Sequence, residues 1–202
     1  MKSSFLRIPL FPLNIVLIPG EVIPLHIFED RYKKMIKDCI AGKKKFGIVN
    51  KNKNKTAVFG CTAKVEEIIS RYDNGSYDVI VKGFERFEIK DKYNELGLWF
   101  GDVVLIENET PSNKNRSLLN KTRDKYLKVL IANKLMNNVE TEISKNISFD
   151  FCQFINLNIS LKQSFIEMRN EKERLLFLNS VFDRVLKVNK ILSSKKPPKH
   201  FD

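Results

Sequence analysis

The 202-residue sequence lacks the short motifs on which most hydrolytic and nucleotide-dependent chemistry depends. No G-x-x-x-x-G-K-[ST], H-E-x-x-H, G-x-S-x-G or G-x-G-x-x-G occurs, which argues against a phosphate-cradling loop, a zinc peptidase helix, a nucleophile elbow and a dinucleotide site. Histidine is also scarce: there are two, and His200 lies near the C-terminus, so a zinc site would need carboxylate ligands. We therefore expect no catalytic residue, no metal and no cofactor, and predict that the chain is not an enzyme.

Cysteine and long apolar runs are equally sparse. The three cysteines, Cys39, Cys61 and Cys152, lie far apart and are odd in number, so they indicate neither a C-x-x-C pair nor a disulfide framework. They are predicted to be buried thiols in a reducing compartment. The most apolar stretch, Ile15–Ile27, is interrupted by two prolines and a glutamate and is shorter than the ~20 residues of a membrane span. No secretory signal follows Met1, so we expect a cytoplasmic protein with no membrane partner.

Positive charge is abundant and unevenly distributed. The net charge is +12, and residues 111–202 hold 18 lysines and arginines against 9 acidic residues. Lys121, Lys125 and Lys128 lie on one face of a predicted helix, which raises the alternative of a nucleic-acid partner. Phe151 and Phe165, however, have helical core spacing and do not alternate with lysines as stacking platforms do. A solvated helix face is therefore the favoured interpretation.

Apolar periodicity divides the chain into two parts. Residues 1–110 contain short alternating runs typical of β-strands, whereas residues 111–194 carry apolar residues at helical spacing. The predicted boundary lies near Pro111, and residues 195–202 form a basic tail. The predicted fold class is α+β: a β domain with one inserted helix, followed by a C-terminal helical bundle.

Local signals locate several elements. A stripe of apolar residues at helical spacing predicts the inserted helix, which should end at Gly42. The stripe consists of Tyr32, Met35, Ile36, Cys39 and Ile40. Asp73-Asn74-Gly75 predicts a hairpin turn, and the polar tract Asn50–Thr56 predicts a solvated loop. In the second part we expect helices over about 115–137, from Ser148, from a Ser160 cap, and from an Asn170–Glu173 capping box.

One set of motifs is far more specific. The strings are Pro9-Leu-Phe-Pro-Leu-Asn14, Val16-Leu-Ile-Pro-Gly20, Ile23-Pro-Leu-His-Ile-Phe-Glu29, Gly60-Cys-Thr-Ala-Lys-Val65 and Val79-x-Val81-x-Gly83-x-x-Arg86-Phe87. Together they resemble the opening of the substrate-binding domain family of Lon proteases, in the form of its stand-alone branch without ATPase and protease domains. The resemblance implies a PUA-like β pseudo-barrel followed by a helical bundle. In this setting Gly20 and Gly83 are expected at turns that a Cβ would obstruct.

The resemblance also implies a function. A domain of this family recognises substrates while other domains carry out hydrolysis, so we expect a non-catalytic module that binds unfolded or exposed protein segments. It would act as an adaptor or chaperone-like accessory to proteolysis, with a protease or chaperone as a further partner. The alternative is a nucleic-acid-binding module that uses the basic helical half.

The sequence names three candidate substrate-binding residues. His26 closes an apolar run before the inserted helix, and Phe84 and Arg86 follow Gly83. They would supply one polar group, one aromatic anchor and one charge, a composition found in recognition hot spots. The alternative is that all three support the fold, with His26 as a hydrogen-bonded core or rim histidine.

Overall fold

The computed structural model describes residues 5–53, 55–107, 113–136, 138–152, 155 and 157–194. Pro111 and the basic tail lie outside the described residues. The contacts divide the described chain into a β unit, residues 5–107 with 157–167, and a helical unit, residues 113–155 with 168–194. Residues 157–167 thus group with the strands, although the sequence analysis placed them in the helical part. The independence of the two parts in solution stays a prediction.

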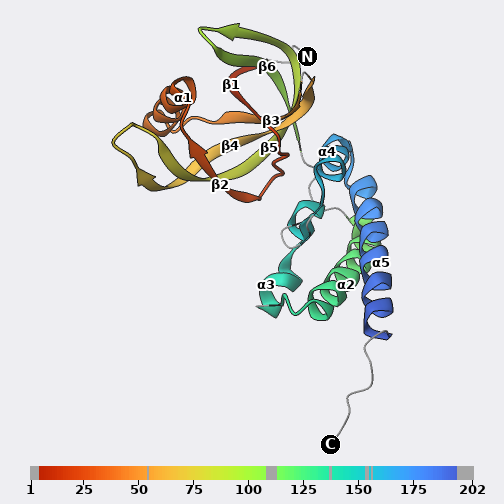
Figure 1. Ribbon diagram of the computed structural model, residues 1–202. Coiled ribbons are helices and arrows are strands. Elements are labelled where there is room, and N and C mark those ends of the chain that lie inside the picture. Colours follow the sequence, from red (N-terminus) through yellow and green to blue (C-terminus); the bar gives the residue numbers. More distant parts are fainter. Residues whose placement is uncertain are drawn as a thin grey trace, which may run out of the picture. The chain divides into compact units, whose positions relative to one another are not determined.

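The β unit is a sheet that closes on itself. Its strands are β1 (Leu6–Leu13), β2 (Val22–Ile27), β3 (Phe46–Asn52), β4 (Lys55–Arg71), β5 (Tyr77–Glu95) and β6 (Leu98–Ile106). They are ordered β2-β5-β4-β3-β1-β6, and β6 also pairs with β5, so five strands form a ring that β2 extends at β5 (Figure 1). The α+β fold class is confirmed, and the closure accounts for the predicted pseudo-barrel.

Two long strands make this closure possible. The first half of β5, Tyr77–Lys82, pairs with β2, whereas its second half, Arg86–Glu95, pairs with β6. The β4–β5 register shifts three times, between Cys61/Ala63, Val65/Glu67 and Ile68/Ser70. Such bulges bend a strand and increase its twist, which lets one strand serve two parts of a curved sheet.

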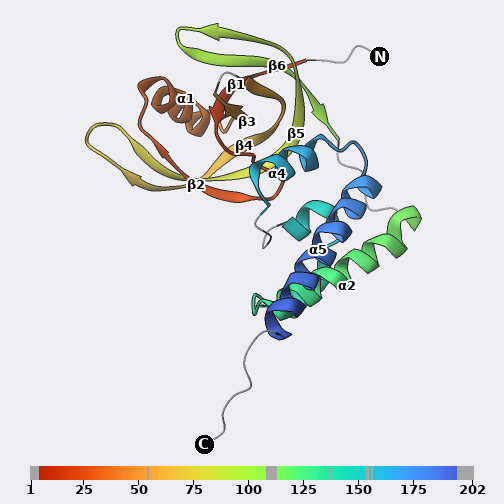
Figure 2. The same ribbon diagram turned by 45° about the vertical axis from the view of Figure 1, so that its right-hand side comes forward.

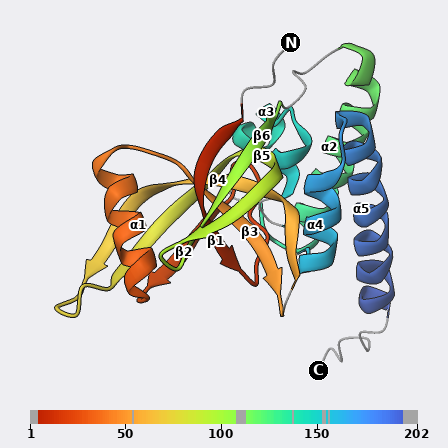
Figure 3. The same cartoon turned by 90° about the horizontal axis from the view of Figure 1, so that it is seen from above.

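Helix α1 (Asp30–Ala41) covers one side of the barrel (Figure 3). The predicted stripe is confirmed: four of its five members, all but Ile40, are buried, and they pack in one cluster with strand residues such as Phe46 and Val79. The helix ends where expected, but Gly42 has φ −87° and the left-handed conformation falls on Lys43, with φ 49°. The stop therefore does not depend on the freedom of a glycine.

The two predicted connections have different outcomes. At Asp73-Asn74-Gly75 the turn is confirmed, since Gly75 has φ 77° and its N–H donates to the carbonyl of Tyr72 at 2.8 Å. The tract Asn50–Thr56 is largely exposed to solvent as expected, but the predicted loop was wrong, because β3 continues to Asn52 and β4 begins at Lys55. Cross-strand pairing overrides the polar composition of this tract.

The helical unit contains α2 (Arg116–Ala132), α3 (Val139–Ser144) and α5 (Glu171–Ser194), with short 3-10 turns at Asn113–Asn115 and Ser148–Cys152. Helices α2 and α5 lie side by side and run in the same direction, because Thr122 contacts Asn179 and Lys125 pairs with Asp183 (Figures 1 and 2). The first predicted helix is shorter than expected, and the one from Ser148 is only a 3-10 turn. The Asn170 cap is confirmed by its 2.9 Å bond from the N–H of Glu173.

Helix α4 (Ile159–Glu167) packs against β4 in the β unit (Figure 2). Its cap is Asn158 rather than Ser160, since the N–H of Leu161 donates to Asn158 Oδ1 at 2.9 Å. Lys162 pairs with Glu21, and Arg86 donates to the carbonyl of Ile166 at 2.9 Å. Polar contacts near both ends of the helix therefore attach it to β5 and to the residue that precedes β2.

Candidate functional site

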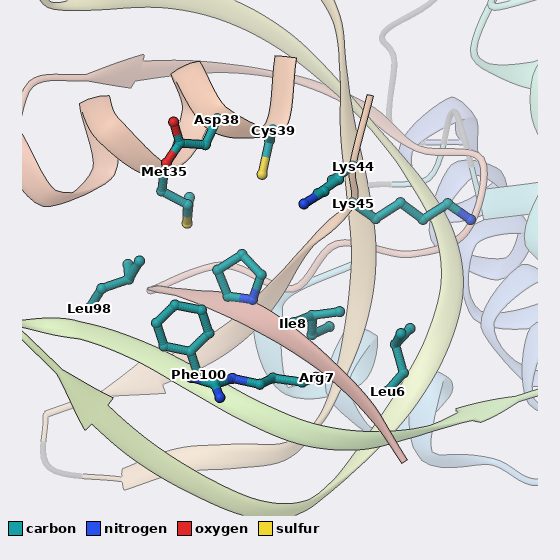
Figure 4. A pocket seen from close by; sticks show the side chains of 11 residues that line it. Leu6, Arg7, Ile8, Met35, Asp38, Cys39, Lys44, Lys45, Leu98 and Phe100 are labelled. Atoms are coloured by element: carbon teal, nitrogen blue, oxygen red, sulfur yellow. The ribbon is translucent and has the colours of Figure 1, made fainter. Parts of the chain in front are cut away.

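An apolar pocket of about 440 Å³ lies between α1 and strands β1 and β6. Three elements far apart in the sequence meet there: β1, α1 with the segment that follows it, and β6. Its lining residues are Leu6, Arg7, Ile8, Pro9, Met35, Asp38, Cys39, Lys44, Lys45, Leu98 and Phe100. Met35 and Cys39, one helical turn apart, point from α1 towards the side chains of Ile8, Leu98 and Phe100 (Figure 4).

The inner surface of this pocket is suited to apolar side chains. Leucine, isoleucine, proline, phenylalanine and methionine make up most of its lining, and methionine adapts its shape to irregular partners. The thiol of Cys39 is not reactive, because its pKa is raised to about 11. Burial is the main cause of this shift, and the negative charge of Asp38 adds to it. The thiol is therefore protonated near neutral pH and is a weak nucleophile.

Four charged residues line the pocket, and two of them, Arg7 and Lys45, form ion pairs. The guanidinium of Arg7 lies 4.9 Å from the ring centres of Tyr93 and Phe100 and pairs with Glu95 at 2.6 Å. Lys45 pairs with Glu85. These pairs hold the long side chains at the edge of the pocket, so the apolar interior stays open to solvent.

A second surface, the His26 cluster, lies on the outer face of β2 and consists of His26, Phe28, Tyr72 and Asp78. The ring of His26 stacks on Phe28 with centroids 5.9 Å apart and meets the edge of Tyr72 at the same distance. Its Nδ1 lies 2.6 Å from Asp78 Oδ1, and the hydroxyl of Tyr72 donates to Asp78 Oδ2 at 2.5 Å. Phe28 is 64% exposed, so the cluster presents an aromatic surface to solvent.

Strand β2 is the one strand of the described sheet with a single neighbour. Its open edge is interrupted by Pro24, which has no N–H to offer an added strand. A partner strand at this edge would lose one main-chain hydrogen bond, which makes β2 a poor site for strand addition.

A family model for the ATP-dependent protease La (LON) substrate-binding domain matches residues 7–192. The chain belongs to the LON substrate-binding domain family. Among solved structures, the N-terminal domain of the Mycobacterium avium complex Lon protease has a TM-score of 0.73 and 16% identity, over 88% of this chain and 98% of that chain. The Lon N-terminal domain protein from Xanthomonas campestris has a TM-score of 0.67 and 21% identity, over 87% and 98%. These similarities show that this chain shares its fold with the two Lon N-terminal domains.

Curated relatives of this LON substrate-binding domain are named as Lon proteases. That of Buchnera aphidicola subsp. Baizongia pistaciae is 27% identical over 198 residues, which are 90% of this chain and 25% of that protein. That of Rickettsia bellii is 29% identical over 206 residues, 93% of this chain and 26% of that protein. The chain thus spans about a quarter of the length of these relatives, and the matching family model describes their substrate-binding domain.

The structure does not bring the three predicted site residues into one site. His26 is exposed and hydrogen-bonded to Asp78, so it is a rim histidine rather than a core one, and it does not line the pocket. The Phe84 ring lies 4.9 Å from the Lys45 ammonium and 5.3 Å from that of Lys64. Arg86 is 1% exposed and bonds to α4, so it lies inside the β unit. In this domain Arg86 supports the fold.

Sequence reasoning missed the pocket for a physical reason. Met35 and Cys39 were recognised only as part of a helix stripe, and nothing in that stripe indicates which members border a cavity. Leu98 and Phe100 are about sixty residues further along the chain. Their meeting depends on the β1–β6 pairing, for which the sequence contains no local signal.

The polar contacts of the His26 cluster predict a specific titration behaviour. Hydrogen bonds from Tyr72, and then from His26, lower the pKa of the Asp78 carboxyl. Because its folded pKa lies below the unfolded value, the stability that it contributes is present at neutral pH and is lost as the pH falls through the lowered pKa. We expect Tyr72→Phe to raise the pKa of Asp78 more than His26→Ala does. NMR titration of the carboxyl carbon measures both shifts, and the reverse order would contradict this assignment.

Proposed function

We propose that this LON substrate-binding domain binds unfolded or exposed apolar segments of other proteins without chemically changing them. The observation that carries the proposal is the solvent-open apolar pocket formed by β1, α1 and β6. Family membership supports it, since the family is described as a substrate-binding domain. In this proposal the domain is an adaptor or chaperone-like accessory to proteolysis in the cytoplasm, with a protease or chaperone as its second partner.

The physical basis is the burial of one or two apolar side chains. Fully burying a leucine or phenylalanine is worth about 1.5–3 kcal/mol, so one pocket provides weak capture of many sequences and little selectivity among them. Such capture suits a module that meets unfolded segments, whose apolar residues are exposed at many positions. No catalytic step is included, because the pocket thiol is protonated and the lining residues form no nucleophile–base pair.

Two exposed leucines provide a matched test. Leu6 lines the pocket and is 43% exposed, whereas Leu105 lies on β6 away from the pocket and is 40% exposed. We expect Leu6→Gln to weaken binding of a reduced, carboxymethylated unfolded protein about fivefold, because a leucine contact worth about 1 kcal/mol is lost. Leu105→Gln should change the affinity by less than twofold. Fluorescence anisotropy measures the affinities, and thermal unfolding verifies that both variants remain folded.

The two variants also define the result that would refute the proposal. Equal affinities for the Leu6→Gln variant and the unmodified chain would mean that the pocket is not the binding site. Equal losses of affinity in the Leu6→Gln and Leu105→Gln variants would show that binding depends on general surface hydrophobicity.

A further inference from the structure

A groove lies on the helical unit between the parallel helices α2 and α5, and it has no role in the function proposed above. Its volume is about 900 Å³, larger than that of the pocket between α1, β1 and β6. Helix α2 contributes Lys128 and Ala132, and α5 contributes five residues: Asp183, Leu186, Lys187, Asn189 and Lys190. We call it the α2–α5 groove.

The groove follows from the parallel packing of its two walls. Thr122 meets Asn179 and Lys125 meets Asp183, so each turn of α2 lies beside the corresponding turn of α5. From Asp183 to Lys190 the α5 wall covers about two helical turns, or roughly 10 Å. The core of the unit, including Tyr126 and Phe182, is buried, whereas the groove residues beyond it are half-buried or exposed.

The groove is cationic. Three lysines, Lys128, Lys187 and Lys190, line both walls, and none of them has a carboxylate partner among the described residues. The one acidic residue of the lining, Asp183, is already paired with Lys125 at 2.6 Å. Between the lysines, Leu186 and Ala132 provide apolar surface. The groove therefore combines a small apolar floor with uncompensated positive charge on both sides.

We propose that the α2–α5 groove binds an acidic amphipathic helix of a partner protein. A third helix fits against two parallel helices because its side-chain ridges enter the groove between them. Small apolar residues on the partner would pack on Leu186 and Ala132. Carboxylates on the partner helix, three or four positions from these apolar residues, would reach the lysines on both walls of the groove.

Charge excludes two other occupants. A symmetric contact with a second copy of this chain would place lysines against lysines at this surface, and the net charge of +12 disfavours any other contact between two copies. The segment 195–202 contains three lysines and one aspartate, so it is repelled as well. A nucleic acid would satisfy the lysines, but no aromatic side chain lines the groove to stack with bases, and the apolar floor would remain unused.

The test uses the full chain and a labelled designed peptide of about 18 residues, whose glutamates flank an alanine and leucine face. The Lys128→Glu/Lys187→Glu variant should bind it more than tenfold more weakly. The matched control is Lys121→Glu/Lys172→Glu, which reverses two exposed lysines on the same helices outside the groove and should change the affinity by less than threefold. A peptide of identical composition with its apolar residues scattered should bind more than fivefold more weakly to the unmodified chain.

A third variant separates groove binding from general attraction. Ala132→Trp keeps every charge and fills the groove, so it should also weaken binding of the designed peptide more than fivefold. Equal losses in the groove and control charge variants, or unchanged binding by Ala132→Trp, would overturn the proposal. Tighter binding of a single-stranded oligonucleotide than of the peptide at ~150 mM salt, lost in the same variants, would favour nucleic acid instead. The Leu6 experiment concerns the β unit, so either proposal can fail independently.

Discussion

Replacing Gly83 with alanine is expected to destabilise the β unit by about 3 kcal/mol or more, because the added methyl group has no space. A Cβ at this position would lie 2.3 Å from the carbonyl oxygen of Ile18, which is a backbone atom and cannot rotate away. The close approach is maintained by two hydrogen bonds of 2.9 Å, from Gly20 N–H to the Gly83 carbonyl and from Gly83 N–H to the Glu21 carbonyl. Urea denaturation followed by circular dichroism measures the change in the free energy of unfolding.

Gly42→Ala is the control for this substitution. Gly42 has φ −87°, which alanine adopts readily, and its added Cβ would meet the Asp38 carbonyl and the flexible Lys44 side chain at 3.2 Å. We expect it to change stability by less than about 1 kcal/mol. If both variants lose the same free energy, the contact with Ile18 does not explain the requirement for glycine at position 83.

The second large effect is expected at Arg174, in the buried network of the helical unit. Its side chain is 0% exposed and donates to Ser148 Oγ at 3.0 Å, to the Met168 carbonyl at 2.9 Å and to Glu171 Oε2 at 2.9 Å. Arg174→Met removes the positive charge and leaves the carboxylate of Glu171 buried without its ion-pair partner. Breaking a buried pair in this way costs about 3–5 kcal/mol, and thermal and urea unfolding measure the loss.

Two further variants define the cause of that loss. Arg184→Met alters an exposed arginine of the same helix and should cost less than about 0.5 kcal/mol. Adding Glu171→Gln to Arg174→Met removes the unpaired charge, so the double variant should be more stable than Arg174→Met alone. If the double variant is less stable, the cost comes from lost packing around the arginine and not from the buried carboxylate.

Elements that depend on local signals were predictable. The stripe of α1 repeats at helical spacing, the Asp73-Asn74-Gly75 turn has a residue suited to positive φ, and Asn170 caps α5 through its own side chain. Each signal acts within a few residues, so it operates before the rest of the chain is in place. The same is true of the first predicted helix, of which only the C-terminal end was misplaced.

Elements that depend on distant partners were not predictable. Helix α3 is six residues long, and its Glu142 is buried with Lys145 against the hydroxyl of Tyr126. A short segment with two charged residues is typical of a surface loop, and only the hydroxyl of Tyr126 on α2 makes the burial of Glu142 favourable. Likewise Arg86 is charged and follows a strand pattern, which indicates an exposed position until α4 supplies the carbonyl of Ile166.

The sequence alone determined the α+β class, the inserted helix and, through its motifs, the resemblance to the LON substrate-binding domain family, because short-range periodicity and motif strings carry that information. Only the tertiary structure decided which residues surround the apolar pocket, which unit α4 packs on and where the lysines of the α2–α5 groove gather. Leu6, Met35 and Phe100 come together through the β1–β6 pairing, and Lys128 and Lys187 through the parallel packing of α2 and α5. Such long-range pairings are selected by the burial of the whole core, so no window of the sequence contains them.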